Sequence, residues 1–150
     1  MLSYLRKKVY RIVTRLYPWF LKAAYGMDIG QNVIISRTAK LDRAINPHGI
    51  HIGSSTWILR EAMVLSHDHC RGLKADTHIG KNCVIGVRSI IMPGVSIGDS
   101  CIVAACSVVT KNTPSHCIVA GNPAKVIKTG VVVRNGKIVE PGQSIKNETR

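Results

Sequence analysis

The chain has 150 residues, enough for one domain with a sizeable core, and 45% of them are hydrophobic although only one is Phe. Its 21 Lys and Arg against 8 Asp and Glu give a formal net charge of +13, which favours an anionic partner such as a nucleic acid, an acidic membrane surface or a phosphate-bearing ligand. No apolar run reaches the roughly 20 residues of a membrane span, and five Cys without a CxxC pair or a signal peptide predict a cytoplasmic protein.

Residues 2–17 are predicted to form an amphipathic helix, and Pro18 is expected to end it. The apolar side carries Leu2, Leu5, Val9, Ile12, Val13 and Leu16, and the basic side carries Lys7, Lys8, Arg11 and Arg15. Such a helix either lies on the inner face of an acidic membrane or caps the first turn of the domain that follows, and both alternatives stay open. Residues 1–25 are assigned to this N-terminal segment.

A six-residue repeat organises the middle of the chain. An aliphatic residue recurs at every sixth position, and the next residue is usually small, as in Ile79-Gly80 and Ile85-Gly86. The anchors in this register are Ile79, Ile85, Ile91, Ile97, Val103 and Val109. A period of six fits neither the 3.6 residues of a helical turn nor the alternation of a single strand, so it predicts an all-β solenoid in which three repeats close one triangular coil.

The repeat also extends upstream of residue 79. One coil is anchored by Ile29, Ile35 and Leu41, and the next by Ile52, Ile58 and Val64. We therefore expect about four coils over residues 29–114, with interruptions at residues 47–51 and 70–78. Cys83 and Cys101, one coil apart, are interpreted as small stacked core residues and not as a disulfide.

The segment "SHDHC" lies where the regular repeat stops and leads into a loop over residues 66–78. Imidazole titrates near neutral pH and suits general base catalysis, and the residues alone leave both His67 and His69 as candidates. Asp68 either orients an imidazole or is a solvated loop acid.

Two other kinds of chemistry are disfavoured at the same loop. A zinc site built from His67, His69, Cys70 and His78 lacks a second defined ligand pair, so we predict no metal. A nucleophilic role for Cys70 lacks any group that would activate its thiolate.

The motifs "PGVSIGD", "SVVTK" and "AGNPAKVI", together with the hexads and the His at the loop entry, resemble those of the hexapeptide-repeat acyltransferases over residues 29–128. Within that family the chain looks like the sugar O-acetyltransferases, including the galactoside, maltose and exopolysaccharide branches. The resemblance implies a left-handed parallel β-helix over residues 26–128, a homotrimer with active sites between subunits, and acetyl-CoA as co-substrate. It assigns the general base to His67 and leaves Asp68 and His69 as supporting candidates.

The resemblance also transfers cofactor positions to this chain. The candidates are Gly86 and Val87 beside the pantetheine arm, Ala104 and Ala105 where the cofactor lies close to the coil, Thr110 and Lys111 below it, and Lys125 and Lys128 near the nucleotide phosphates. Residues 129–150 form a C-terminal tail, in which Asn135-Gly136 between two β-rich runs predicts a hairpin.

The expected function is an acetyl-CoA-dependent O-acetyltransferase that acts on a hydroxyl of a sugar or polysaccharide precursor. The alternatives are N-acetylation of an amino sugar, acetylation of serine, and a non-catalytic β-helix scaffold. Basic residues without interleaved aromatics argue against binding of single-stranded nucleic acid. The expected location is cytoplasmic, with peripheral membrane contact through residues 2–17 if that helix binds lipid.

Overall fold

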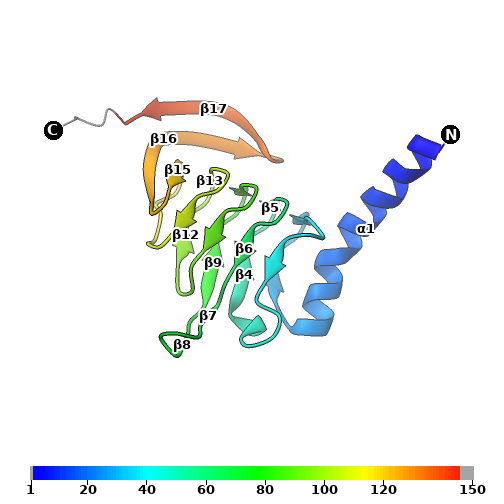
Figure 1. Cartoon of the computed structure of the whole chain (residues 1–150). Coiled ribbons are helices and arrows are strands. Elements are labelled where there is room, and N and C mark those ends of the chain that lie inside the picture. Colours follow the sequence, from blue (N-terminus) through cyan, green and yellow to red (C-terminus); the bar gives the residue numbers. More distant parts are fainter. Residues whose placement is uncertain (1, 146–150) are drawn as a thin grey trace.

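The computed structural model describes residues 2–145, and for residues 2–8, 10 and 11 it describes the backbone alone. Helix α1 (Leu2–Tyr25) precedes a stack of triangular coils, and a long hairpin follows the stack (Figure 1).

Three parallel sheets form the sides of the stack. Sheet A contains β1 (Asp28–Ile29), β4 (Ile50–Ile52), β9 (Thr77–Ile79) and β12 (Ser96–Ile97). Sheet B begins with β2 (Ile34–Ile35), β5 (Trp57–Ile58), β10 (Val84–Ile85) and β13 (Ile102–Val103). Sheet C contains β3 (Lys40–Leu41), β6 (Met63–Val64), β11 (Ile90–Ile91) and β14 (Val108–Val109). Each coil takes one strand from each sheet, so the predicted left-handed parallel β-helix of four coils is confirmed.

The hexad anchors fill the interior of the stack, since all six from Ile79 to Val109 are at most 3% exposed. The small residue after an anchor has a steric reason. A Cβ on Gly80 would lie 2.5 Å from Asp99 Oδ1 and 2.7 Å from the backbone carbon of Gly98 in the next coil. Close stacking of coils therefore requires the Ile-Gly pairs that define the repeat.

Three cysteines belong to this interior. Cys83, Cys101 and Cys117 are fully buried, and the sulfur atoms of Cys101 and Cys117 lie 3.5 Å apart. Hydrogen bonding to Cys101, together with burial, raises the pKa of the Cys83 and Cys117 thiols, which keeps both protonated at neutral pH. They act as small core residues, as the sequence interpretation had it for Cys83 and Cys101.

The helix does not end at Pro18, so that prediction was wrong. α1 continues to Tyr25, and its last turns contact β1 and β2 of the first coil. Leu21 is fully buried in the core, and Tyr17 and Tyr25 pack against it. Burial of these side chains offsets the hydrogen bond that the proline lacks, a case of tertiary packing overriding local preference.

The C-terminal hairpin is confirmed. Strand β15 (Cys117–Gly121) pairs with β16 (Ala124–Arg134), which turns at Asn135-Gly136 into β17 (Lys137–Ser144), and all three extend sheet B. Val131 and Val133 are fully buried, and a Cβ on Gly136 would lie 2.4 Å from the Trp57 ring. The hairpin thus reaches back along the stack to the second coil. The tail predicted over residues 129–150 extends past the described residues at 146–150.

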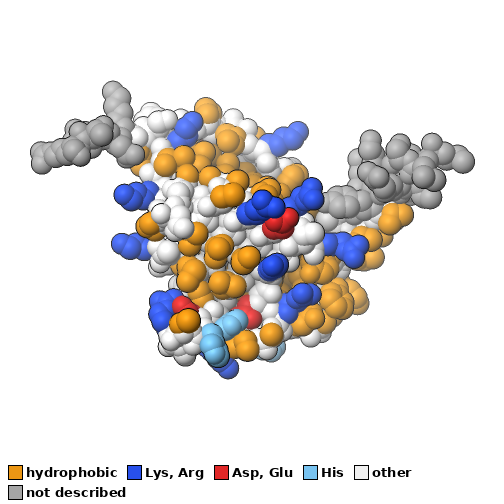
Figure 2. Space-filling view, viewed as in Figure 1, with side chains coloured by type: hydrophobic (Ala, Val, Ile, Leu, Met, Phe, Trp, Pro, Cys, Tyr) orange, Lys and Arg blue, Asp and Glu red, His pale blue; other side chains and the backbone are white. Residues whose placement is uncertain are grey.

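Figure 2 shows hydrophobic side chains spread over one face of the coils, with Lys and Arg side chains around them and few acidic ones. Among the described residues, no helix is both long enough and apolar enough to cross a membrane.

Candidate active site

The loop predicted over residues 66–78 leaves the stack between sheets C and A. The last strand of the second coil, β6, ends at Val64, so the "SHDHC" segment lies beyond that strand and not in it. Instead, β7 (His67–Asp68) pairs antiparallel with β8 (Leu73–Lys74). The Ala75 amide donates to the Ser66 carbonyl at 3.0 Å and closes the base of this small hairpin. The backbone around His67 is therefore fixed by its own hydrogen bonds.

The imidazole of His67 is held by an aspartate that the sequence analysis did not identify. Nδ1 of His67 hydrogen-bonds to Oδ2 of Asp42, and the Asp42 side chain is only 2% exposed. Asp42 follows β3 at the same corner of the triangle, one coil before His67. With Nδ1 engaged by a carboxylate, Nε2 is the nitrogen left to accept a proton.

Further donors orient the Asp42 carboxylate. The Ser66 hydroxyl donates to Oδ2 at 3.0 Å, and the Ile45 amide donates to Oδ1 at 3.3 Å. Burial by itself would raise the pKa of Asp42, but the hydrogen bonds from His67, Ile45 and Ser66 outweigh it and lower the pKa below its usual value. Asp42 is therefore ionised at neutral pH and can stabilise a positive charge on His67.

The two supporting candidates, Asp68 and His69, have other surroundings than Asp42. The Asp68 carboxylate pairs with Arg71, whose Nε lies 2.7 Å from Oδ2 and whose amide donates to Oδ1 at 3.1 Å. These bonds from Arg71 lower the pKa of Asp68. His69 is exposed on the loop. In the described structure, Asp42 and not Asp68 is the carboxylate that contacts His67.

Most cofactor candidates border sheet C. Gly86, Val87, Ala104 and Ala105 lie at the corner between sheets B and C, in the third and fourth coils. Thr110 and Lys111 follow β14 at the corner between sheets C and A, which is also the corner of His67. Between the corners, the outward side chains of sheet C include Met63, Ile90 and Val108, all partly exposed.

Small residues at the first of these corners allow the coils to stack closely. A Cβ on Gly86 would lie 2.5 Å from the Val103 carbonyl oxygen and 2.7 Å from the Ala105 nitrogen. Val87 and Ala105 are exposed beside this column. Gly86 is itself buried, so its lack of a side chain serves the stacking of the coils.

The two candidate lysines lie away from both corners. Lys125 and Lys128 are on β16, opposite Ala120 and Ile118 of β15. Lys125 is exposed and Lys128 is half-buried. Both remain candidates for phosphate contacts at the end of the stack.

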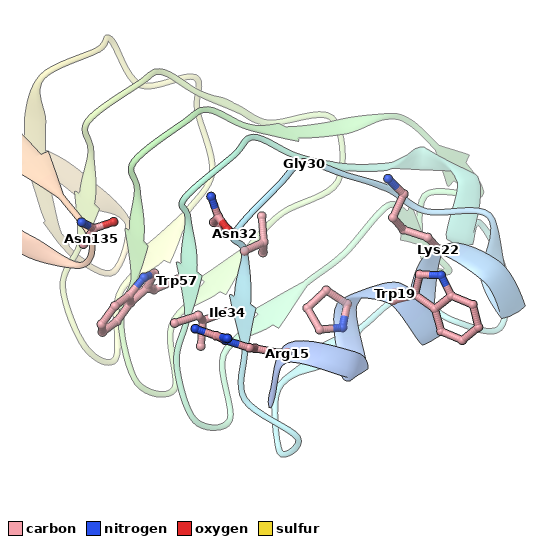
Figure 3. Close-up of a pocket in the computed structure, with 10 residues that line it drawn as sticks. Arg15, Trp19, Lys22, Gly30, Asn32, Ile34, Trp57 and Asn135 are labelled. Carbon is pink, nitrogen blue, oxygen red and sulfur yellow. The ribbon is translucent and has the colours of Figure 1, made fainter. Parts of the chain in front are cut away.

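One hollow of the described structure lies elsewhere. It has a volume of about 640 Å³ between α1, the first two coils and the hairpin turn, as Figure 3 shows. Its lining includes Trp19, Trp57, Arg15 and Lys22, and it contains none of the predicted catalytic or cofactor residues.

Stacked six-residue turns with a carboxylate-imidazole pair at a corner loop define a hexapeptide-repeat β-helix protein with a site suited to proton transfer. Residues 77–111 match the family model described as "Hexapeptide repeat of succinyl-transferase". This match to a hexapeptide-repeat model agrees with the family resemblance predicted from the sequence.

Relatives of the chain carry acetyltransferase names. YvoF of Bacillus subtilis, named provisionally as an acetyltransferase, is 30% identical over 116 residues, which cover 74% of this chain and 65% of that protein. WcaF of Escherichia coli, named provisionally as a colanic acid biosynthesis acetyltransferase, is 29% identical over 149 residues, covering 77% of this chain and 78% of that protein. The solved structure of the polySia specific acetyltransferase NeuO is similar with a TM-score of 0.59 and 26% identity, over 81% of this chain and 56% of that one. The chain thus spans less than two thirds of the length of YvoF.

Proposed function

We propose that this chain is an acetyl-CoA-dependent O-acetyltransferase that acts on a hydroxyl of a sugar or polysaccharide precursor, with His67 as general base. The observation that carries the proposal is the hydrogen bond from His67 Nδ1 to the buried, ionised Asp42. The names of YvoF, WcaF and NeuO support acetyl transfer, and those of WcaF and NeuO support a polysaccharide as the acceptor.

The proposed reaction moves one proton and one acetyl group. Nε2 of His67 takes the proton of the acceptor hydroxyl while the hydroxyl oxygen attacks the thioester carbonyl. The C–S bond then breaks, and the CoA thiolate takes up the proton from His67. Asp42 faces Nδ1 throughout and stabilises the imidazolium that forms between these steps.

A homotrimer with sites between subunits is part of the proposal. On one chain, His67 and the Gly86–Ala105 corner lie at opposite edges of sheet C, whereas general base catalysis needs contact at about 3 Å. A side of the coil spans about six residues, or up to roughly 20 Å at 3.3 Å per residue. A cofactor corner of a neighbouring subunit packed along sheet C would bring thioester and base together.

Peripheral membrane contact through residues 2–17 is a further part of the proposal. Where side chains are described, Val9, Ile12 and Leu16 are each at least half exposed, and Trp19 is 68% exposed. This spacing places them along one side of α1, while Leu21 on another side is buried in the core. One end of α1 thus caps the first coil, and the other presents an apolar stripe that suits a lipid surface.

The test of catalysis is release of free CoA from acetyl-CoA over a panel of sugars, nucleotide-sugars, amino sugars and serine. We expect turnover with a sugar hydroxyl, and His67→Ala should lower it by about 10² to 10⁴, with little change in acetyl-CoA affinity. His69→Ala is the matched control, since it removes an exposed imidazole from the same loop. Near-normal turnover in a folded His67→Ala protein would refute the assignment of the base, and serine as sole acceptor would refute the sugar.

A further inference from the structure

A second group of titratable residues lies on the outer face of sheet A, and acyl transfer does not use it. Asp28, His51 and His78 occupy the same register position on β1, β4 and β9. Each precedes a core Ile, so alternation along the strand turns all three side chains outward. The rings of His51 and His78 stack, with centroids 4.4 Å apart and planes inclined by 13°.

Asp76 joins this column from the end of the active-site loop. Its Oδ2 lies 3.6 Å from Nε2 of His51, and one ligand atom from each of His51, Asp76 and His78 lies within 4.8 Å of the others. Gly49 makes room for the carboxylate, because a Cβ there would lie 3.0 Å from Asp76 Oδ1. Two imidazoles and one carboxylate therefore converge beside a surface hollow of about 360 Å³.

The environment of His51 leaves one nitrogen without a partner. Nδ1 lies 3.3 Å from Oδ2 of Asp28, which accepts the proton of Nδ1–H. Nε2 is buried and has no hydrogen bond to any described residue, since the 3.6 Å to Asp76 exceeds hydrogen-bond range. A carboxylate on one imidazole nitrogen with the other left free is the arrangement that orients metal-binding histidines.

We propose that His51, His78 and Asp76 bind Zn²⁺, with Asp28 orienting His51. Zinc bonds to nitrogen and oxygen of about 2.0–2.2 Å in a tetrahedral site separate the ligand atoms by about 3.3–3.6 Å. The His51–Asp76 pair already has this separation, and one ligand atom of the exposed His78 lies within 4.8 Å of both. Water fills the fourth position.

This site shares only His78 with the zinc ligands that the sequence analysis considered and disfavoured. The proposal also departs from the prediction of no metal. The ligands join two coils, because His51 belongs to the second and His78 to the third. Asp76 and His78 also end the loop that begins near His67. The ion would therefore tie the end of the active-site loop to the preceding coil, without touching the His67–Asp42 pair.

Zinc binding to the full-length, chelator-treated protein tests the proposal. After Zn²⁺ is added back and the excess is removed by desalting, metal analysis should give one Zn²⁺ per chain. Addition of Co²⁺ instead of Zn²⁺ should give the visible absorption of a tetrahedral site. His51→Ala and His78→Ala should lose the ion, and Asp28→Ala should weaken binding by about 10- to 100-fold. His69→Ala is the matched control and should keep it. Circular dichroism checks that each variant folds. Asp76→Asn, a near-isosteric change at an exposed ligand, is a second variant in which to measure zinc binding.

Several outcomes would overturn the proposal. One is the absence of stoichiometric zinc in the unaltered protein. Another is zinc retained in both His51→Ala and His78→Ala but lost in Cys70→Ser, which would place the ion at the exposed loop thiol. Each readout is independent of acyl transfer, so a failed zinc test leaves the proposed enzyme activity standing, and the reverse holds too.

Discussion

Asp42→Asn should separate the role of the buried carboxylate from that of the loop. The substitution keeps the size of the side chain but removes its charge, and with it the ionic hydrogen bond to His67. A hydrogen bond to a charged group contributes about 1.5–3 kcal/mol. If this bond strengthens only as the imidazolium forms, its loss should lower turnover by about 10- to 150-fold at one factor of ten per 1.36 kcal/mol.

Steady-state release of CoA measures the effect, and the apparent constant for acetyl-CoA should change little because Asp42 is buried away from solvent. Asp68→Asn is the matched control, since it makes the same chemical change next to His67 in a carboxylate paired with Arg71. A larger loss in Asp68→Asn than in Asp42→Asn would show that Asp68 orients the base and would refute our reading of the site.

Asp42→Asn should also change how the stability of the protein depends on pH. The pKa of Asp42 is lowered in the folded protein, so its carboxylate stabilises the fold above its ordinary pKa near 4 and loses that contribution as pH falls through the folded value. The unaltered protein should therefore lose stability relative to Asp42→Asn as the pH falls below about 4. Urea unfolding at several pH values measures this, and a difference that does not change with pH would contradict the assignment.

Two further predictions concern the stack. Gly80→Ala should lower the free energy of unfolding by more than about 1 kcal/mol, because its Cβ would collide with Gly98 and Asp99 of the next coil; urea denaturation measures this, and an unchanged midpoint would contradict the packing argument. Ellman's reagent should react with Cys70 and Cys106 in the native protein and with Cys83, Cys101 and Cys117 only after unfolding, and rapid reaction of all five thiols would show that the core is not closed around them.

The fold was predictable from sequence because the hexad anchors act locally. A buried Ile or Val recurs every six residues, and the Gly after it is required because the next coil lies close to its backbone. The end of α1 was not predictable in this way. Pro18 carries a strong local signal, but the outcome depends on the burial of Leu21 against the core, which no local pattern reveals.

The contacts of the site residues were harder to predict because insertions change the number of residues that separates stacked positions in adjacent coils. Lys81 and Asp99 are in contact across 18 residues, as an uninterrupted stack requires, but His51 contacts Asp28 across 23. Asp42 contacts His67 across 25 residues for the same reason. An acid directly after the buried Leu41, at the corner of His67, was the one signal in the sequence, and it becomes informative only once the insertion at residues 47–51 is placed.

The placement of candidate residues at both edges of sheet C leads to a last prediction about assembly. His67→Ala removes the base, and Ala105→Trp should block the exposed cofactor corner, so each variant alone should be inactive. If the base of one subunit serves the corner of the next, a trimer that contains both variants has one intact site of three. Denaturing and refolding an equal mixture gives mixed trimers in three cases of four, so activity should recover to roughly a quarter of the unaltered protein. Sedimentation confirms the trimer, and refolding each variant separately is the control. No recovery in a trimeric mixture would mean that base and corner act within one chain, and the width of sheet C would then have to be bridged by the cofactor itself.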